Sequence, residues 1–262
     1  MTRLAEYQDK YIHAAFSRDE LGVLEVRFHT NGGEFVWSRT AHEELSRLFH
    51  DIGRDPDNRV VVLTGTGEHF MNSADLASFG DDQAGDRWEP TWTEGSRMLF
   101  DHLAIEVPVI CAVNGRFIGH SELAVLCDII IASEDTAFQD GHLRGISAVP
   151  GDGIQLIWMA LLGPNRGRHF LYMSTELDAA EALRLGVVGE VLPKSQVLPR
   201  AREIARDLAQ IHHPTLKYTR TILVQELREK YLQRLGATLA YEGLAIKGYM
   251  SHMQQILAAQ RE

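Results

Sequence analysis

The stretch VNGRFIGHSELAVLCDIIIASEDTAFQDGHLRGISAVPGDG, residues 113–153, gathers the residue types that acid–base chemistry requires around one apolar run. A Gly-rich turn carries His120, and a strand-like apolar run over 128–132 follows it. A loop then carries His142, and a Gly-Asp-Gly turn centred on Asp152 closes the stretch. Because loops held by a rigid scaffold concentrate functional residues, we expect the two histidines and the aspartate to meet in one site.

The composition limits the kinds of partner. The 262 residues are 45% hydrophobic and 24% charged, as in ordinary globular proteins. The net charge of −10 disfavours nucleic acid or an anionic membrane as a partner. The opening MTRLAEYQDKY does not resemble a signal segment, and no apolar run approaches the roughly 18 residues of a membrane span. Cys111 and Cys127 lie in apolar surroundings, which predicts buried reduced thiols. We expect a soluble cytoplasmic protein.

Periodicity predicts the first elements of the chain. Apolar and polar residues alternate over 21–29, which predicts a strand, and a turn at 31–33 predicts a hairpin partner at 34–37. Thr40 with Glu43 three residues later predicts the N-cap of a helix. Apolar residues at helical spacing predict its buried face: Leu45, Leu48, Phe49 and Ile52.

Strands alternate with helices along most of the chain, and the C-terminal part favours helix, with interruptions at Pro214 and Gly236. Residues 80–95 are acidic and contain tryptophan and proline, which indicates an excursion from the core that acts as a lid. We expect an α/β core over 1–195 and an α-helical subdomain over 196–262. Continuous apolar runs predict strands buried on both faces at 60–64 and 109–113.

Other kinds of active site find less support. No G-x-S-x-G elbow supports a serine nucleophile. His120, Glu122 and His142 could ligate zinc, but no H-E-x-x-H is present and the cysteines lack metal spacing, so we expect no metal. Asp152 has two interpretations: an aspartate between glycines suits a turn, and an aspartate beside a histidine stabilises the imidazolium.

Three segments resemble the crotonase (enoyl-CoA hydratase/isomerase) superfamily. They are EHFMNSADLASF, VPVICAVNGRFIGHSELAVLCDIIIASEDTAFQD and AVPGDGIQLIWMALLGPNRGRHFLYMSTELDAAEALRLGVVGEVLP. The resemblance implies a crotonase-like spiral of ββα units. It also implies an α-helical C-terminal trimerisation region, and hence a homotrimer or a dimer of trimers.

The departures from that pattern are informative. Hydratases of the superfamily usually have a glutamate where this chain has His142, and their Gly-Ala-Gly-Gly turn is here the turn of Asp152. Their Gly-Gly-Gly-Cys-Glu turn is one residue shorter here, at 118–122. The lysine common after Ala-Asp-Leu is missing after 74–76, which disfavours coenzyme A.

The variant pattern resembles the β-diketone hydrolase branch, the branch of 6-oxocamphor hydrolase, which cleaves carbon–carbon bonds without coenzyme A. VWSRTAHEEL, VNGRFIGHSE, FQDGH, VPGDG and LAYEGLA carry this likeness. By resemblance, the catalytic positions are His142, Asp152, Glu242 and His120, and the substrate-binding positions are Trp37, Ala74, Gly119 and His42. His42 lies in a helical pattern and Glu242 is one acidic residue of a predicted helix, so structural and solvent-facing roles stay open for them.

The resemblance and the residues together predict retro-Claisen hydrolysis of a β-diketone to a keto acid without a cofactor. His142, oriented by Asp152 and assisted by Glu242, would activate water. Backbone N–H groups of Ala74 and of the Gly119–His120 turn would hold the enolate, with the His120 and Trp37 side chains as further donors. Two alternatives remain: a crotonase reaction on an acyl-CoA thioester, and a non-catalytic subunit of the same fold.

Overall fold

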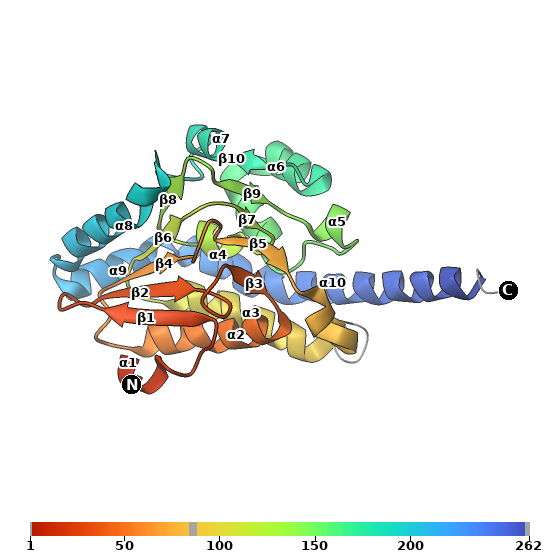
Figure 1. Cartoon of the computed structure of the whole chain (residues 1–262), viewed down its shortest axis with the longest axis horizontal. Helices are drawn as coiled ribbons and strands as arrows, with labels where there is room; N and C mark the ends of the chain where they lie inside the picture. The colour runs from red at the N-terminus through yellow and green to blue at the C-terminus, as the bar shows by residue number, and fades with distance from the viewer. Residues whose placement is uncertain (1, 84–87, 260–262) are drawn as a thin grey trace.

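A six-stranded sheet lies at the centre of the computed structural model, which describes residues 2–83 and 88–259 (Figure 1). The strand order is β1-β2-β4-β6-β8-β11. The pairing is parallel except between β1 and β2, which form an antiparallel hairpin. The strands are β1 (Ala14–Arg18), β2 (Val23–Phe28), β4 (Val60–Thr64), β6 (Val109–Val113), β8 (Ile129–Ser133) and β11 (Glu190–Leu192).

Four strands of a second, five-stranded sheet each follow one of β2, β4, β6 and β8 along the chain, and the fifth strand is β10. Its order is β10-β9-β7-β5-β3, and the strands from β9 to β3 are parallel. This succession is the predicted crotonase-like spiral. The strands are β3 (Phe35–Trp37), β5 (Met71–Ala74), β7 (Phe117–Ile118), β9 (Ala137–Gln139) and β10 (Leu177–Asp178).

The central strands are buried on both faces, as their apolar runs predicted. Val60 and Val62 of β4 pack in one apolar cluster with residues of α8 (Lys194–Ala209). Val61 and Leu63 point to the opposite face and belong to the main core. Every residue of β4 is buried, so the absence of polar alternation in this strand follows from its two packed faces.

Helix α2 (Arg39–Arg54) carries the predicted buried face of leucines, phenylalanine and isoleucine. Its N-cap is Ser38, whose hydroxyl accepts a hydrogen bond from the Ala41 N–H at 3.2 Å. The prediction of Thr40 as the cap is therefore wrong, because the serine comes directly after a strand in extended backbone, the conformation that an N-cap requires.

The predicted hairpin partner at 34–37 is also wrong. β3 pairs in parallel with β5 of the second sheet, and the partner of β2 is β1, which precedes it. β1 is a short edge strand in which exposed and half-buried residues alternate with little apolar contrast, so its sequence gives a weak signal.

The segment 80–95 is only partly an excursion. Residues 84–87 lie outside the described part of the chain, and α3 (Trp88–Ala104) already begins at Trp88. The indole N–H groups of Trp88 and Trp92 donate to backbone carbonyls of the C-terminal helix α10 (Gln225–Ala259) at 2.9 and 2.8 Å. The first turns of α3 are thus part of the packed body of the molecule, and a 3₁₀ segment, η1 (Leu76–Gln83), precedes them.

The C-terminal part is helical, and one of the two predicted interruptions is confirmed: residues 210–212 separate α8 from the next helix, directly before Pro214. The interruption predicted at Gly236 is wrong. Pro214 lies in the first turn of α9 (His213–Leu223), and Gly236 lies within α10 (Gln225–Ala259), which runs beyond the body of the molecule (Figure 1). A Cβ at Gly236 would meet the Trp92 ring at 3.3 Å, so glycine allows that ring to approach. The other helices are α1 (Leu4–Tyr7), α4 (Glu122–Val125), α5 (His142–Gly145), α6 (Ile154–Met173) and α7 (Ala179–Arg184). Among the described helices, none combines the length and apolar character needed to cross a bilayer.

Candidate active site

The ends of the second sheet bring the predicted residues together. In a parallel sheet the carboxyl ends of the strands lie at one edge, and ligands bind there in many α/β proteins. β3 ends at Trp37 and β5 ends at Ala74. His120 follows β7, and His142 follows β9 as the first residue of α5. Four segments that are far apart in the sequence therefore lie together at this edge of the second sheet.

A cavity of about 160 Å³ opens at this edge. Its size is close to the ~150 Å³ of an engineered cavity that takes up benzene, so it suits a compact molecule. Every residue predicted for the site lines it: Trp37, His42, Ala74, Gly119, His120, His142, Asp152 and Glu242. Most of the remaining wall is apolar, and includes Met71, Leu76, Phe79, Met98, Ile118, Ile146, Leu239 and Ile246.

Backbone geometry favours an oxyanion hole between β5 and the turn after β7. The Asp75 N–H donates to the Trp37 carbonyl at 2.7 Å, so the preceding N–H, that of Ala74, points away from β3 and toward β7. The Gly119 N–H donates to the Gln139 carbonyl at 3.0 Å. The turn's candidate donor is therefore the N–H of His120 and not that of Gly119.

His120 lies between an indole ring and two carboxylates. Its ring stacks on Trp37, with centroids 3.8 Å apart and planes 29° apart. Its Nδ1 is 2.9 Å from Oε1 of Glu122 and 3.0 Å from Oδ2 of Asp152. Burial lowers the pKa of His120, but these carboxylates outweigh it and raise the pKa to about 9. At neutral pH the ring is an imidazolium with Nε2–H left as a donor.

His142 is surrounded by three carboxyl groups. Its Nδ1 lies 2.5 Å from Oδ1 of Asp140, and its Nε2 lies 3.4 Å from Oδ2 of Asp152 and 3.9 Å from Oε1 of Glu242. Burial lowers the pKa of His142, but the charges of Asp152, Asp140 and Glu242 raise it well above its usual 6.5.

We expected Asp152 to orient His142, and the structure gives that position to Asp140. Asp152 instead lies between Nδ1 of His120 and Nε2 of His142. Burial raises the pKa of Asp152, yet the two histidines lower it below its ordinary value. Asp140 is fully buried two residues before His142, and this D-x-H spacing was the signal that could have found it.

The Gly-Asp-Gly turn satisfies both interpretations of Asp152. Its Oδ1 accepts a hydrogen bond from the Ile154 N–H at 3.3 Å, as a turn residue does, while Oδ2 faces the histidines. A Cβ at Gly151 would clash with the Thr238 carbonyl of α10. The absence of a side chain at Gly151 thus allows the turn to pack closely against α10, and this packing positions Asp152.

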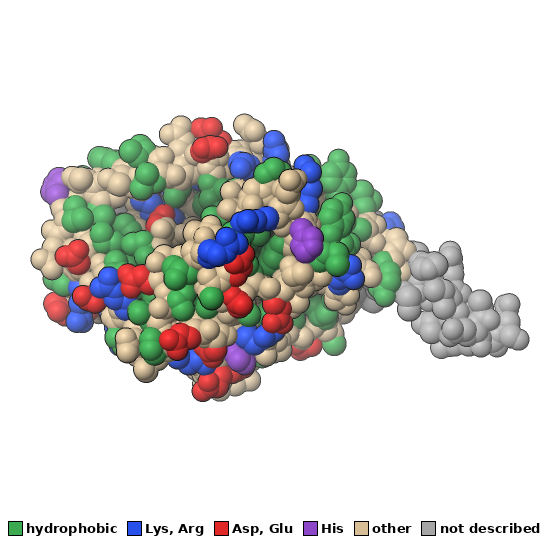
Figure 2. Space-filling view, turned by 90° about the horizontal axis from the view of Figure 1, so that it is seen from above, with side chains coloured by type: hydrophobic (Ala, Val, Ile, Leu, Met, Phe, Trp, Pro, Cys, Tyr) green, Lys and Arg blue, Asp and Glu red, His purple; other side chains and the backbone are tan. Residues whose placement is uncertain are grey.

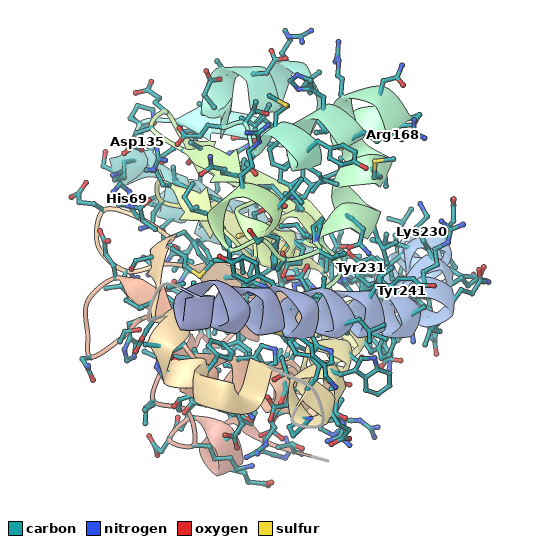
Figure 3. The ribbon with its side chains drawn as sticks, turned by 90° about the vertical axis from the view of Figure 1, so that its right-hand side faces the viewer. His69, Asp135, Arg168, Lys230, Tyr231 and Tyr241 are labelled. Carbon is teal, nitrogen blue, oxygen red and sulfur yellow. The ribbon has the colours of Figure 1, made fainter. Side chains whose placement is uncertain are left out.

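Glu242 is a buried residue of α10 and not part of a solvated face. It is 6% exposed, whereas the adjacent Tyr241 is 62% exposed. Figure 3 looks onto α10 and labels Tyr241 together with Tyr231, which is fully buried. Burial and the charge of Asp152 raise the pKa of Glu242 to about 8, although His142 lowers it.

His42 occupies another wall of the cavity. Its Nδ1 is 2.9 Å from Oε2 of Glu94, and Glu94 accepts two hydrogen bonds from Arg39 at 2.5 and 3.0 Å. Burial lowers the pKa of His42, which is edge-on to Trp37 with centroids 5.6 Å apart. His42 is therefore both anchored in α2 and part of the wall. Glu94 could not be identified as its partner from sequence pattern, because the two residues lie 52 positions apart.

Three residues of the site have the geometry of potential metal ligands. His120, His142 and Asp152 offer atoms that lie within 4.8 Å of one another. This set differs from the zinc alternative considered above, because Asp152 takes the place of Glu122. In both histidines the raised pKa favours a proton, with which a metal ion would have to compete.

Comparisons with known proteins agree with this architecture. The family model of enoyl-CoA hydratase/isomerase matches residues 19–242, and the chain therefore belongs to this family, the crotonase superfamily of enzymes. A carnitinyl-CoA dehydratase of Citrobacter koseri is 31% identical over 189 residues, which are 71% of this chain and 70% of that protein. A probable peroxisomal enoyl-CoA hydratase of Arabidopsis thaliana is 29% identical over 217 residues, or 82% and 78% of the two chains.

Among solved structures, a β-diketone hydrolase from the cyanobacterium Anabaena superposes with a TM-score of 0.91 and 46% identity. The match covers 94% of this chain and 98% of the Anabaena chain. An enoyl-CoA hydratase/isomerase from Mycobacterium paratuberculosis has a TM-score of 0.83 at 21% identity, over 90% and 94% of the two chains. At that identity the second likeness bears on the fold alone.

Proposed function

We propose that this enzyme is a β-diketone hydrolase that cleaves a carbon–carbon bond by a retro-Claisen reaction and releases a keto acid. One observation carries the proposal: His142, held at Nδ1 by Asp140, directs Nε2 into the same small apolar cavity as the stacked His120 and Trp37. A base thus faces a set of hydrogen-bond donors across a compact space. The likeness to the Anabaena hydrolase supports the same reaction.

In the proposed first step, water loses a proton to Nε2 of His142 and the resulting hydroxide bonds to one carbonyl carbon. Asp140 keeps the proton of the neutral ring on Nδ1, so that Nε2 is the free base. The tetrahedral intermediate then collapses. The carbon–carbon bond breaks, its electron pair passes to an enolate, and the enolate carbon takes up one proton while His142 gives up the proton that it took from water. One water is consumed for each diketone.

The enolate oxygen would lie among donors from three strand ends. The Ala74 and His120 N–H groups form the backbone part of this set, and the His120 imidazolium and the Trp37 indole add side-chain donors. One such donor typically contributes about 2.7–4 kcal/mol to a transition state. A general base adds roughly 10²–10⁴-fold in rate. These magnitudes suit a reaction in which the second carbonyl already delocalises the charge.

A class of substrate follows from the ligand of the Anabaena hydrolase. That protein was solved with (S)-3-oxocyclohexyl acetic acid, a keto acid. Joining its carboxyl carbon to carbon 4 of its ring, with loss of water, gives a bridged bicyclic 1,3-diketone. We propose this class of substrate here, and the apolar walls of the cavity suit such a compact ring system.

The alternative is a reaction on an acyl-CoA thioester, which the names of the sequence relatives favour. Coenzyme A carries phosphates, which proteins usually bind with Lys or Arg. The described residues that line the cavity include neither type. Acidic and basic side chains are interspersed on the face shown in Figure 2, and the net charge is −10. These features support a small uncharged substrate.

The test combines a panel of cyclic, bridged and linear 1,3-diketones with calorimetric titration of coenzyme A. We expect stoichiometric release of acid from at least one diketone and no measurable binding of coenzyme A. Tight binding of coenzyme A with no diketone consumed would favour the thioester reaction. Inertness toward both would favour a non-catalytic member of the family.

We also propose that the chain forms a homotrimer or a dimer of trimers. Large apolar side chains are exposed on α9 and α10, which supports self-association. They include Tyr218, Ile222, Leu223, Leu232 and Leu244. Light scattering after gel filtration should give three or six chain masses, and the mass of a single chain would contradict the proposal.

A further inference from the structure

Glu122 lies directly behind His120 and outside the described wall of the cavity. It is the first residue of α4, it is fully buried, and its Oε1 is 2.9 Å from Nδ1 of His120. The neighbouring Ser121 accepts a hydrogen bond from the Trp158 indole at 3.0 Å. The short helix is thus fixed in the core, and Glu122 is placed to act on His120 without touching a substrate.

Titratable side chains face His120 from several elements. Glu122 comes from α4 and Asp152 from the turn before α6. His142 from α5 is edge-on to the ring, with centroids 5.8 Å apart. His42 from α2 and Glu242 from α10 line the same cavity. Burial alone would remove the proton from His120, and the Glu122 carboxylate opposes this more strongly than any other group.

Asp152 cannot serve His120 alone, because the two histidines share its Oδ2. When His142 takes a proton from water, the negative charge of Asp152 faces two cations. Within the part of the chain that the structure describes, the side-chain hydrogen bond of Glu122 is to His120. Burial and the charge of Asp152 raise the pKa of Glu122, while His120 lowers it, so the Glu122 carboxylate and the His120 imidazolium stabilise each other.

We propose that Glu122 is a positioning residue that keeps His120 protonated, so that the enolate forms beside an imidazolium and not beside a neutral ring. The proposal rests on the proposed function and adds a residue to it. It assigns a role to a buried carboxyl group that the hydrolysis steps above do not use.

Titration of the His120 ring tests the proposal without any substrate. In protein labelled with ¹⁵N-histidine, the His120 signals are those that vanish in His120→Gln. We expect the ring to titrate near pH 9 in the native chain. In Glu122→Gln its pKa should fall by about one unit or more, because an opposite charge in contact is lost. Glu122→Asp, which keeps the charge, should recover part of the shift.

Glu44→Gln is the matched control. Glu44 lies 2.9 Å from Nδ1 of the buried His13, the same kind of pair, but neither residue lines the cavity. We expect Glu122→Gln to lower kcat at pH 8 in step with the protonated fraction of His120, which is about two-fold for a one-unit fall in its pKa and about 10-fold for a two-unit fall, with little change in KM. Glu44→Gln should leave kcat and KM unchanged. An unmoved His120 titration in Glu122→Gln overturns the proposal. If Glu122→Gln does not fold, a smaller downward shift must appear in Glu122→Asp, whose shorter side chain holds the charge farther from His120, and its absence there overturns the proposal. If no diketone is turned over, the proposed function fails while the titration still decides the role of Glu122.

Discussion

Two walls of the cavity carry a buried histidine with Nδ1 held by a carboxylate, and the two histidines differ in charge. His142 is bound by Asp140 at 2.5 Å, and His42 by Glu94 at 2.9 Å. At His42, Arg39 also binds Glu94, and burial lowers the pKa. The guanidinium itself lowers the pKa further.

At His142 the balance reverses. Two more carboxyl groups, Asp152 and Glu242, face Nε2, and the pKa is raised despite burial. The groups that raise the pKa of His142 are the carboxyl groups of Asp152, Asp140 and Glu242. The carboxylate beside His42 is shared with an arginine, whereas, among the described residues, those beside His142 are not. This difference in neighbouring charge favours a proton on His142 over one on His42. The proton is therefore held more tightly at His142 than at His42.

The largest expected effect follows from removal of His142. His142→Ala should lower kcat by roughly 10²–10⁴-fold, because the general base is lost, while the affinity for the keto acid product is kept. Steady-state kinetics and product titration measure the two quantities. His42→Ala, which changes the other wall, is the comparison and should lower kcat far less. Equal losses in the two variants would remove the distinction between the walls.

Asp152→Asn should lower kcat roughly 10²-fold and also change its pH dependence. His142 must lose its proton to act as a base, so kcat/KM should rise with pH, with an inflection above 6.5. Because the charge of Asp152 raises the pKa of His142, its removal should move this inflection to lower pH. A pH–rate profile measures both the fall in kcat and the shift of the inflection. Native activity in this variant would leave Asp152 as a turn residue alone.

Much of the fold could be predicted from local pattern. The strands Val60–Thr64 and Val109–Val113 appear as continuous apolar runs because both of their faces are packed. β1 could not be found, because an edge strand needs no apolar contrast. The pairing of β3 could not be found either, because its partner β5 lies more than thirty residues away and local pattern carries no information on pairing.

The predicted site residues line the cavity, but the hydrogen bonds between its carboxylates and histidines could not be predicted from the sequence. The resemblance placed His120, His142 and Asp152 together, and the structure brings them within 4.8 Å. Which carboxylate meets which ring nitrogen depends on ring orientation, and that is set by packing in three dimensions. Asp140 and Glu94 were missed for this reason, although both contact a histidine of the cavity.

Arg39→Gln should make the two walls more alike. With the guanidinium removed, the Glu94 carboxylate would act on His42 alone, so the pKa of His42 should rise. A ¹⁵N titration of the histidine rings measures this shift, and we expect only a few-fold change in kcat. Arg47→Gln, which removes an exposed pair with Glu43, is the control. A pKa of His42 that stays low would show that burial and the charge of His120 set it without Arg39.

Glu242→Gln should have the smallest effect on rate and a clear effect on stability. The pKa of Glu242 is raised from 4.5 to about 8 in the folded state, so between these values the unfolded chain ionises while the folded chain does not. The native chain thus loses stability as pH rises through this window. The variant lacks this loss, so its Tm relative to the native chain should increase from pH 5 to pH 8. A difference in Tm that is constant with pH would contradict the buried neutral carboxyl group.

Hydrolysis of a bridged bicyclic 1,3-diketone in H₂¹⁸O without coenzyme A tests the central claim most directly. Mass spectrometry of the carboxyl-bearing fragment of the product reports where the oxygen of water goes. Attack of water on one carbonyl predicts a keto acid that carries one ¹⁸O in its carboxyl group for each turnover, and far slower formation of this product with His142→Ala. A keto acid without label in that group, or product formed only when coenzyme A is added, would contradict the account.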